Sequence, residues 1–378
     1  MKTASTAFTS LAFQSNMGST PHHLNANRVL DSRLHAVNIP NGYYPKSLPF
    51  SGNRLEPCLR QTLNGRSQLL DPQGAFVLTN TDLLPEGGRH VTIDVNESTL
   101  LMHLVGDMGI NNQLQHEIVS QIHDEILSDT NNAHNLVFGL GDWVYPSGPF
   151  DESASEVERV KETVLNQYEP LSKLSNLYGV LGNHEYGNKD HMGDPAIFMK
   201  IADDSGIKLP GRYYQMTLRA PEFDVEIFAL DTSTLSVDEP QLVWFKDQLC
   251  KVVEAETQSP KKVWKMVVAH HPIQTSGHHM DENLFLSDLI KDQISDIDFY
   301  LAGHEHGIEC LSRTTEYPYT IISGSGAESH PIETKKEADF GANNPGFVAL
   351  DISGEEIVIK MMLQNEKGSW DRHSLLTI

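Results

Sequence analysis

The chain has 378 residues, which is enough for a large core, and its hydrophobic content of 39% is typical of a globular protein. No apolar run approaches the roughly 18 residues of a membrane-spanning helix, so we expect no membrane span. A net charge of −23 disfavours binding to nucleic acids and anionic membranes, and an anionic substrate would need a local positive centre such as metal ions.

The N-terminal part of the chain lacks a sustained hydrophobic period. Ser, Asn, His, Pro and Gly dominate residues 1–75, which predicts a loop-rich or partly disordered extension ahead of a folded domain at residues 76–378. The short apolar patch Ala7–Phe13 is interrupted by polar residues and is a poor secretory signal. The sequence therefore leaves the location of the protein undecided between the cytoplasm and export by a transit-like segment.

The first well-defined element is an apolar strand predicted at Leu100–Val105. After it, apolar residues recur every fourth position from Ile110 to Ile126, which predicts an amphipathic helix capped by Asn111 or Asn112.

A second apolar run, Asn135–Leu140, predicts the next strand and ends in the segment Gly141-Asp142-Trp143-Val144-Tyr145. A strand, a helix and a strand of this length form a right-handed parallel unit. We therefore expect Asp107 and Asp142 to lie at one sheet edge, where open α/β sheets bind their ligands.

The rest of the chain alternates helices and strands. Helices are predicted at Glu152–Leu174, Gln241–Ala255 and Glu282–Ile294, and further strands at Gly74–Leu78, His90–Val95, Leu177–Leu181, Val225–Leu230, Lys265–Ala269 and Phe299–Ala302. The strand-rich remainder, with Thr320–Ser323, Phe347–Asp351 and Glu356–Leu363, predicts a second sheet.

Five of these strand ends carry side chains that bind metals. They are Asp107, Asp142 with Tyr145, Asn183 with His184, His270, and His304 with His306. So many donors without a thiolate suggest two ions, and one carboxylate must then bridge them, most naturally Asp142. A phenolate from Tyr145 suits a trivalent ion, whereas amide and neutral imidazole donors suit a divalent one.

These segments resemble the motif blocks of the purple acid phosphatases, within the calcineurin-like metallophosphoesterases. The blocks are Gly106-Asp107-Met108-Gly109, Gly141-Asp142-Trp143-Val144-Tyr145, Gly182-Asn183-His184-Glu185, Val267-Val268-Ala269-His270 and Gly303-His304-Glu305-His306. The similarity is to the short, tartrate-resistant type and runs from about Leu101 to the C-terminus. Most metallophosphoesterases have Asp-x-His in the first block. Here Met108-Gly109 follows Asp107, and Tyr145 completes the set, as in the purple subgroup.

The resemblance implies an α/β fold, an αββα sandwich of two mixed sheets flanked by helices. It places Asp107, Asp142, Tyr145 and His306 at Fe(III), and Asp142, Asn183, His270 and His304 at a divalent iron, zinc or manganese ion. It also implies outer histidines at His184 and His279, although His278 is adjacent and either of the two could face the site. His271 and Glu305 are expected only to support these residues.

The function implied is an acid phosphatase that hydrolyses phosphate monoesters, with small-molecule phosphate esters or phosphoproteins as partners. A phosphodiesterase or protein phosphatase with the same ions is the alternative, and a non-catalytic metal-bound effector is a more distant one. The tartrate-resistant type has a long regulatory loop where this chain has only the twelve residues Thr232–Val243. We therefore expect an open site, and the oligomeric state stays undetermined.

Overall fold

A computed structural model describes residues 85–130, 133–187, 191–279, 284–331 and 339–375, together with the backbone of three strands nearer the N-terminus. These are β1 (Arg60–Leu63), β2 (Arg66–Leu70) and β3 (Phe76–Leu78), which pair antiparallel in the order β1-β2-β3. The sequence predicted β3 but not the other two. Most of the predicted extension at residues 1–75 lies outside the described residues, so that prediction stays untested.

A seven-stranded sheet has the order β18-β17-β16-β5-β6-β7-β8. The predicted strand at Leu100–Val105 is confirmed as its central strand β5, which pairs parallel with β6 (His134–Gly139) through α1 (Gln113–Ser128). Asn112 caps α1, and its side chain accepts the Gln115 N–H at 2.9 Å. The other strands are β7 (Asn176–Gly179), β8 (Ile207–Lys208), β16 (Gly346–Ile352), β17 (Ile357–Gln364) and β18 (Trp370–Leu375).

An eight-stranded sheet has the order β15-β13-β14-β12-β11-β10-β9-β4. Its central strands β10, β11, β12 and β14 run parallel to one another. The bounds are β4 (Arg89–Asp94), β9 (Tyr214–Arg219), β10 (Phe223–Ala229), β11 (Lys262–Val268), β12 (Phe299–Ala302), β13 (Ile308–Leu311), β14 (Tyr319–Ser323) and β15 (Phe340–Ala342).

The prediction that the C-terminal strands form a second sheet of their own is wrong. β14 pairs with β12, whereas β16 and β17 extend the sheet of β5, with Val348 opposite Leu104. An apolar period identifies a strand but carries no information about a partner more than two hundred residues away. The five donor-bearing strand ends therefore come from both sheets, three from β5, β6 and β7 and two from β11 and β12.

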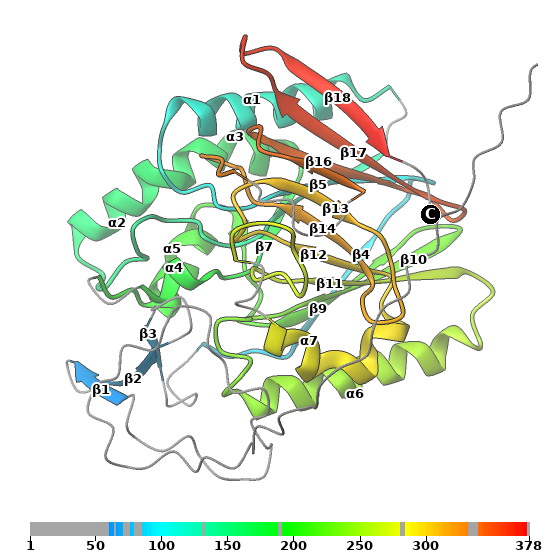
Figure 1. Cartoon of the computed structure of the whole chain (residues 1–378), viewed down its shortest axis with the longest axis horizontal. Coiled ribbons are helices and arrows are strands. Elements are labelled where there is room, and N and C mark those ends of the chain that lie inside the picture. Colours follow the sequence, from blue (N-terminus) through cyan, green and yellow to red (C-terminus); the bar gives the residue numbers. More distant parts are fainter. Residues whose placement is uncertain are drawn as a thin grey trace, which may run out of the picture. The chain divides into compact units, whose positions relative to one another are not determined.

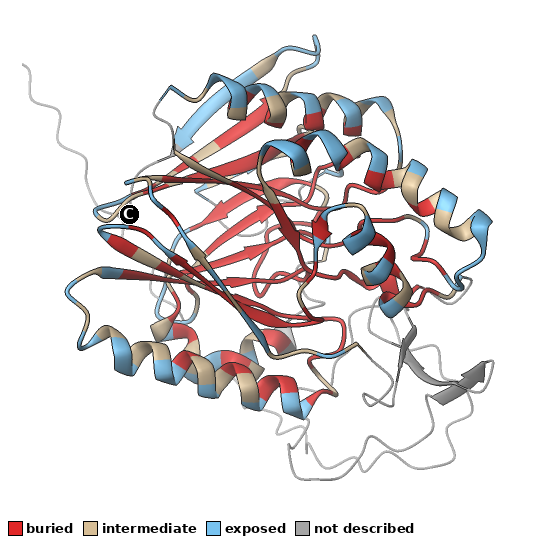
Figure 2. Cartoon of the chain, turned by 180° about the vertical axis from the view of Figure 1, so that it is seen from behind, coloured by how far each residue is buried: buried red, intermediate tan, exposed pale blue. Residues whose placement is uncertain are grey.

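The two sheets face each other across the main core (Figure 1). This core contains Leu100, Met102 and Leu104 of β5 together with Val225 and Ile227 of β10. Figure 2 shows that the strands between the two layers of helices are largely buried. Because both faces of β5 are covered, its sequence is a nearly continuous apolar run, whereas the first five residues of β10 alternate between apolar and charged.

Helices cover the outer faces of the two sheets. On one side lie α1, α2 (Ala154–Val160) and α3 (Asn166–Leu174), and on the other α6 (Glu239–Glu256) and α7 (Leu284–Ile290). The single helix predicted at Glu152–Leu174 contains a π-helical turn at Lys161–Leu165, and it begins after the capping residue Ser153. Two short helices, α4 (Asn183–Tyr186) and α5 (Pro195–Asp204), were not predicted. The αββα sandwich is confirmed.

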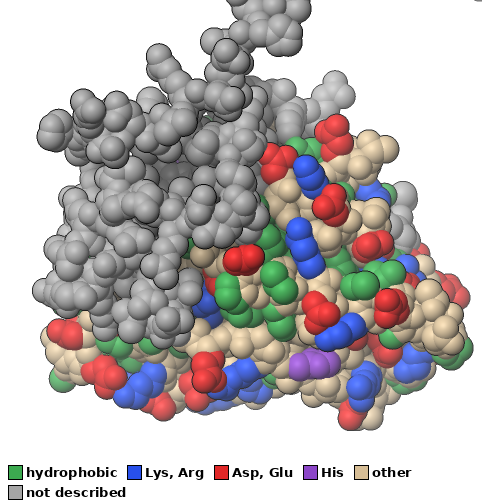
Figure 3. Space-filling model, turned by 90° about the horizontal axis from the view of Figure 1, so that it is seen from below, with side chains coloured by type: hydrophobic (Ala, Val, Ile, Leu, Met, Phe, Trp, Pro, Cys, Tyr) green, Lys and Arg blue, Asp and Glu red, His purple; other side chains and the backbone are tan. Residues whose placement is uncertain are grey.

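The solvent face seen from the side of α6 carries acidic and basic side chains interspersed (Figure 3). Among the described residues, no helix combines the length and the apolar character needed to cross a membrane.

Candidate metal centre

Each predicted donor lies just beyond the carboxyl end of a strand. Asp107 follows β5, Asp142 and Tyr145 follow β6, Asn183 begins α4 after β7, His270 follows β11, and His304 and His306 follow β12. The chain turns sharply at three of these positions, because Asp107, Asp142 and His304 have φ values of 56°, 53° and 68°. Residues other than glycine rarely adopt this left-handed backbone conformation, which costs about 1–3 kcal/mol at each position.

The strained turns are held by hydrogen bonds between the segments. The His304 N–H donates to Asp107 Oδ2 at 2.8 Å, and the Asp107 N–H donates to the Gly141 carbonyl at 3.1 Å. The two sheets are thus joined at the site itself, which fixes the donors relative to one another.

One group of donors surrounds the Tyr145 hydroxyl. This oxygen lies 3.1 Å from Asp107 Oδ1, 3.1 Å from Asp142 Oδ2 and 3.2 Å from His306 Nε2. His306 Nε2 is also 3.4 Å from Asp107 Oδ1. Two carboxylates, a phenol and an imidazole therefore point at one position.

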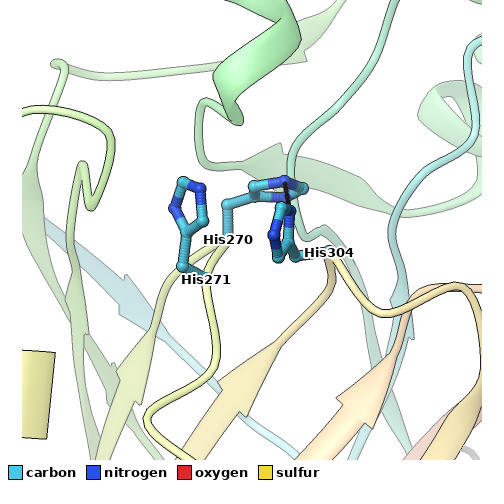
Figure 4. Close-up of side chains that lie close together, drawn as sticks. All are labelled: His270, His271 and His304. Carbon is cyan, nitrogen blue, oxygen red and sulfur yellow. Dashed lines mark hydrogen bonds between the residues drawn. The ribbon is translucent and has the colours of Figure 1, made fainter. Parts of the chain in front are cut away.

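A second group surrounds His270 Nε2. This atom lies 3.0 Å from Asn183 Oδ1, 3.2 Å from His304 Nδ1 and 3.2 Å from Asp142 Oδ2. His270 Nδ1 lies 2.8 Å from the Leu140 carbonyl, an interaction that turns Nε2 toward the other donors. Figure 4 shows His270 and His304 in this contact. Asp142 Oδ2 contacts both the Tyr145 hydroxyl and His270 Nε2 and so belongs to both groups.

The spacing of these donors fits metal ligation. Donors at right angles around one ion, with bonds of about 2.0–2.1 Å, lie about 3 Å apart, and the observed contacts fall close to that value. Two of the residue groups with metal-ligating geometry contain His270, one with Asp107 and Asp142 and the other with His271 and His304.

The charges of the site also favour bound cations. Burial raises the pKa of the Tyr145 phenol well above its usual range, and the neighbouring Asp142 and Asp107 raise it further. Burial alone would lower the pKa of His270, but Asp142 and Asp107 raise it to about 9. At His306, too, burial alone would lower the pKa, but Asp107 and Glu328 raise it to about 9. Protons on these imidazoles supply the positive charge that metal ions would otherwise bring.

The predicted outer histidines lie at the rim of the two donor groups. His184 Nε2 is 3.9 Å from Asp142 Oδ2, and its ring centroid is 4.2 Å from that of Tyr145. His279 lies with its ring centroid 4.5 Å from that of His304, whereas His278 is exposed. Between the two adjacent histidines, it is therefore His279 that lies beside the site.

Buried glutamates hold the turns that carry the donors. Glu185 accepts the backbone N–H groups of Asp142 at 3.1 Å, Trp143 at 2.7 Å and Gly182 at 2.7 Å. Glu305 accepts the N–H groups of His278 and His279, as the supporting role expected for it requires. A Cβ on Gly182 would lie 2.2 Å from Asp142 Oδ1, so only glycine allows this approach.

Two neighbours of the site were missed by the sequence analysis. Glu328 Oε1 lies 3.0 Å from His306 Nδ1, and the ring of His330 stacks on His306 with 4.4 Å between centroids. Neither residue follows a predicted strand or belongs to a motif block, so the sequence held no signal for them. Glu185 lies inside the Gly-Asn-His-Glu block, but nothing in the sequence showed which N–H groups it accepts.

The chain matches known proteins at the segments that build this site. Residues 102–307 match the family model described as calcineurin-like phosphoesterase, and the chain belongs to this family. The family is metal-dependent, and membership supports hydrolase activity on phosphate esters.

The particular relatives point to one branch of that family. The chain is similar to purple acid phosphatase 17 of Arabidopsis thaliana, at 26% identity over 60% of this chain and 68% of the relative. It is similar to purple acid phosphatase 4 of the same plant at 23% identity, over 64% of this chain and 75% of the relative. The resemblance to purple acid phosphatases is thus confirmed, at low identity.

A solved structure shares the fold. It is GAP50, the anchor in the inner membrane complex of Plasmodium, with a TM-score of 0.54 and 19% identity over 74% of this chain and 89% of that one.

Proposed function

We propose that the protein hydrolyses phosphate monoesters with a binuclear Fe(III)-M(II) centre, in which M is iron, zinc or manganese. The observation that carries this proposal is the pair of donor groups sharing Asp142 Oδ2, one built around a phenol and the other around imidazoles. A phenol whose pKa is raised by burial and by two carboxylates ionises only beside a strongly charged cation, which favours a trivalent ion there.

The ligands follow from the two groups. Asp107, Asp142, Tyr145 and His306 would hold Fe(III), and Asp142, Asn183, His270 and His304 the divalent ion. When bound, the two ions supply Lewis acidity and a nucleophile for displacement at phosphorus.

The chain's own residues do the rest. His184 lies beside Tyr145 and His279 beside His304. Each is placed to hold a phosphate oxygen or to give a proton to the leaving oxygen. Glu185 and Glu305 keep the turns that carry Asp142 and His279 in place.

The substrates we propose are small phosphate esters or phosphoproteins rather than nucleic acids. A net charge of −23 repels a polyphosphate backbone, whereas a single phosphate group needs only the local positive charge of the ions.

Turnover of an aryl phosphate, together with metal analysis of the purified protein, tests the proposal. We expect two ions per chain, at least one of them iron, and hydrolysis of the monoester but not of a bis-aryl diester. Faster hydrolysis of the diester would favour the phosphodiesterase alternative.

A non-catalytic role is the second alternative. GAP50 is an anchor with the same fold, so the fold alone does not decide between an enzyme and a binding protein. Retention of both ions without turnover of any phosphate ester would select this alternative.

A further inference from the structure

His271 is a buried histidine that the proposed ligand set does not use. It is 3% exposed and follows His270 directly at the end of β11. Its ring centroid lies 4.5 Å from that of His304 and 4.9 Å from that of His270, and Figure 4 shows it standing beside this pair. Its Nε2 is buried and has no hydrogen-bond partner among the residues that the structure describes.

Thr232 fixes the tautomer of this histidine. The Thr232 Oγ1 accepts the backbone N–H of His271 at 3.1 Å and lies 2.8 Å from His271 Nδ1. Thr232 is itself buried, and in the described part of the chain Nδ1 is the only acceptor within reach of its hydroxyl hydrogen. Because the hydroxyl donates to Nδ1, the neutral ring carries its proton on Nε2.

Nε2–H is therefore a buried donor beside the divalent half of the site. A histidine with a purely structural role would satisfy such a group with a backbone carbonyl, as His270 Nδ1 does with Leu140. Ligation of an ion by Nε2 would require the Thr232 hydroxyl to give up its acceptor. A phosphate oxygen satisfies the donor without disturbing Thr232.

We propose that His271 is a further substrate-binding residue, which donates its Nε2–H to an oxygen of a phosphate group held at the divalent half of the site. This inference rests on the proposed function. It adds to the two outer histidines a third one, which is held in the donor tautomer by Thr232.

The experiment compares four variants of the metal-loaded chain with inorganic phosphate as the probe. His271→Phe removes the donor, Thr232→Val removes the hydroxyl but leaves His271 in place, and Thr232→Ser keeps the hydroxyl. His271→Gln retains a side-chain N–H. We expect His271→Phe and Thr232→Val to bind phosphate about tenfold more weakly by calorimetry, because the first removes the Nε2–H donor and the second removes the hydroxyl that keeps the proton on Nε2. Thr232→Ser should match the wild type, and His271→Gln should fall between it and His271→Phe.

Two further readouts separate binding from a structural effect. In Thr232→Val, KM for an aryl phosphate should rise about tenfold with kcat nearly unchanged, because the interaction is made equally in the ground and transition states. Both ions should remain in all four variants. Loss of an ion from His271→Phe would make His271 a metal ligand, and unchanged phosphate affinity in His271→Phe and Thr232→Val would also overturn the inference.

A test that needs neither metals nor turnover separates this inference from the proposed function. Nitrogen-15 NMR of histidine-labelled, metal-free protein should show His271 as the Nε2–H tautomer in the wild type and in Thr232→Ser. An Nδ1–H tautomer in the wild type overturns the inference even if the enzyme is fully active. A wild type that retains no ions would instead refute the proposed function.

Discussion

Asp142 is the residue on which both donor groups depend. Its Oδ2 contacts Tyr145 and His270 within 3.2 Å, and its Oδ1 accepts the His184 N–H at 2.9 Å. One side chain therefore links the two halves and the rim. Any change at this carboxylate should therefore affect both donor groups and the position of His184.

Asp142→Asn is expected to lose much of the bound metal from both halves and to lower turnover at least about a hundredfold, since even outer partners of ligands cost 10–100-fold. Metal analysis after desalting checks this, with the exposed Asp203→Asn as the matched control. Retention of both ions would mean that another group bridges them.

Tyr145→Phe tests the phenol. A phenolate on Fe(III) absorbs visible light, so the loaded wild type should be coloured and the variant bleached. The ring contact with His184 is kept by phenylalanine, which limits structural side effects. Unchanged colour in the variant, measured by visible absorption at equal iron content, would remove Tyr145 from the ligand set.

Metal loading should release protons. In the metal-free protein the pKa values of His270 and His306 are raised to about 9, so both rings are charged at pH 7, and ions must displace these protons to bind. Metal affinity should therefore rise from pH 6 to pH 9 and level off above it. Calorimetric titration in two buffers of different ionisation enthalpy measures the protons released; none at pH 7 would contradict this charge state.

The stability of the metal-free protein should change in the opposite direction. Both imidazoles have a folded pKa above the unfolded value of about 6.5, so their stabilising contribution is complete below pH 6.5 and disappears as pH rises through 9. The free energy of unfolding contributed by these residues should thus be larger at pH 6.5 than at pH 9. Denaturant titrations at the two pH values, compared with His270→Gln, check the sign.

At the scale of elements, a buried charge cluster ties four segments together behind the site. Arg212, 4% exposed, contacts Asp231 Oδ2 at 2.9 Å and Asp238 Oδ2 at 2.5 Å. Tyr186 of α4 donates its hydroxyl to Asp231, and Asp238 caps α6. Because α4 begins at Asn183, the cluster also positions one of the proposed ligands.

Arg212→Leu leaves two buried carboxylates without their cation and should lower the free energy of unfolding by about 3–5 kcal/mol. Lys200→Ala is the matched control, because its ion pair with Glu152 is exposed to solvent and contributes little to stability. Chemical denaturation measures both variants. Equal losses of unfolding free energy in the two variants would show that the buried cluster stabilises the fold no more than an exposed ion pair does.

Local pattern explains which of these elements the sequence could predict. The strand ends were predictable because buried apolar runs stop where polar donors begin, and α1 because its apolar residues recur every fourth position. The Arg212 cluster was not predictable, because its partners Asp231 and Asp238 lie 19 and 26 residues away and meet only after folding. The same reason hid the pairing of β16 with β5. Glu328 was also invisible, since it touches His306 from a loop without a pattern.

At the scale of the whole molecule, the connection between Asp231 and α6 is short. α6 begins at Glu239, so seven residues, Thr232–Asp238, connect the strand end to the helix, and most of them are buried. So short and packed a connection holds no long loop to fold over the metals.

The intact chain should therefore be fully active without processing. Limited proteolysis should remove residues of the N-terminal segment without raising turnover, measured by mass spectrometry and an aryl phosphate assay on the same samples. A several-fold rise after a cut between Thr232 and Val243 would contradict this prediction. A rise after loss of residues 1–75 would give the role of a lid to that segment.

The contact between His304 and Asp107 joins residues 197 positions apart, and it closes the site by linking one sheet to the other. During synthesis, Asp107 leaves the ribosome long before His304 does, so their contact cannot form until most of the chain has been made. Contacts of such long sequence separation form late and slowly. The proposed metal ions would therefore reach their full affinity only after the two sheets have docked, so that metal binding would follow folding.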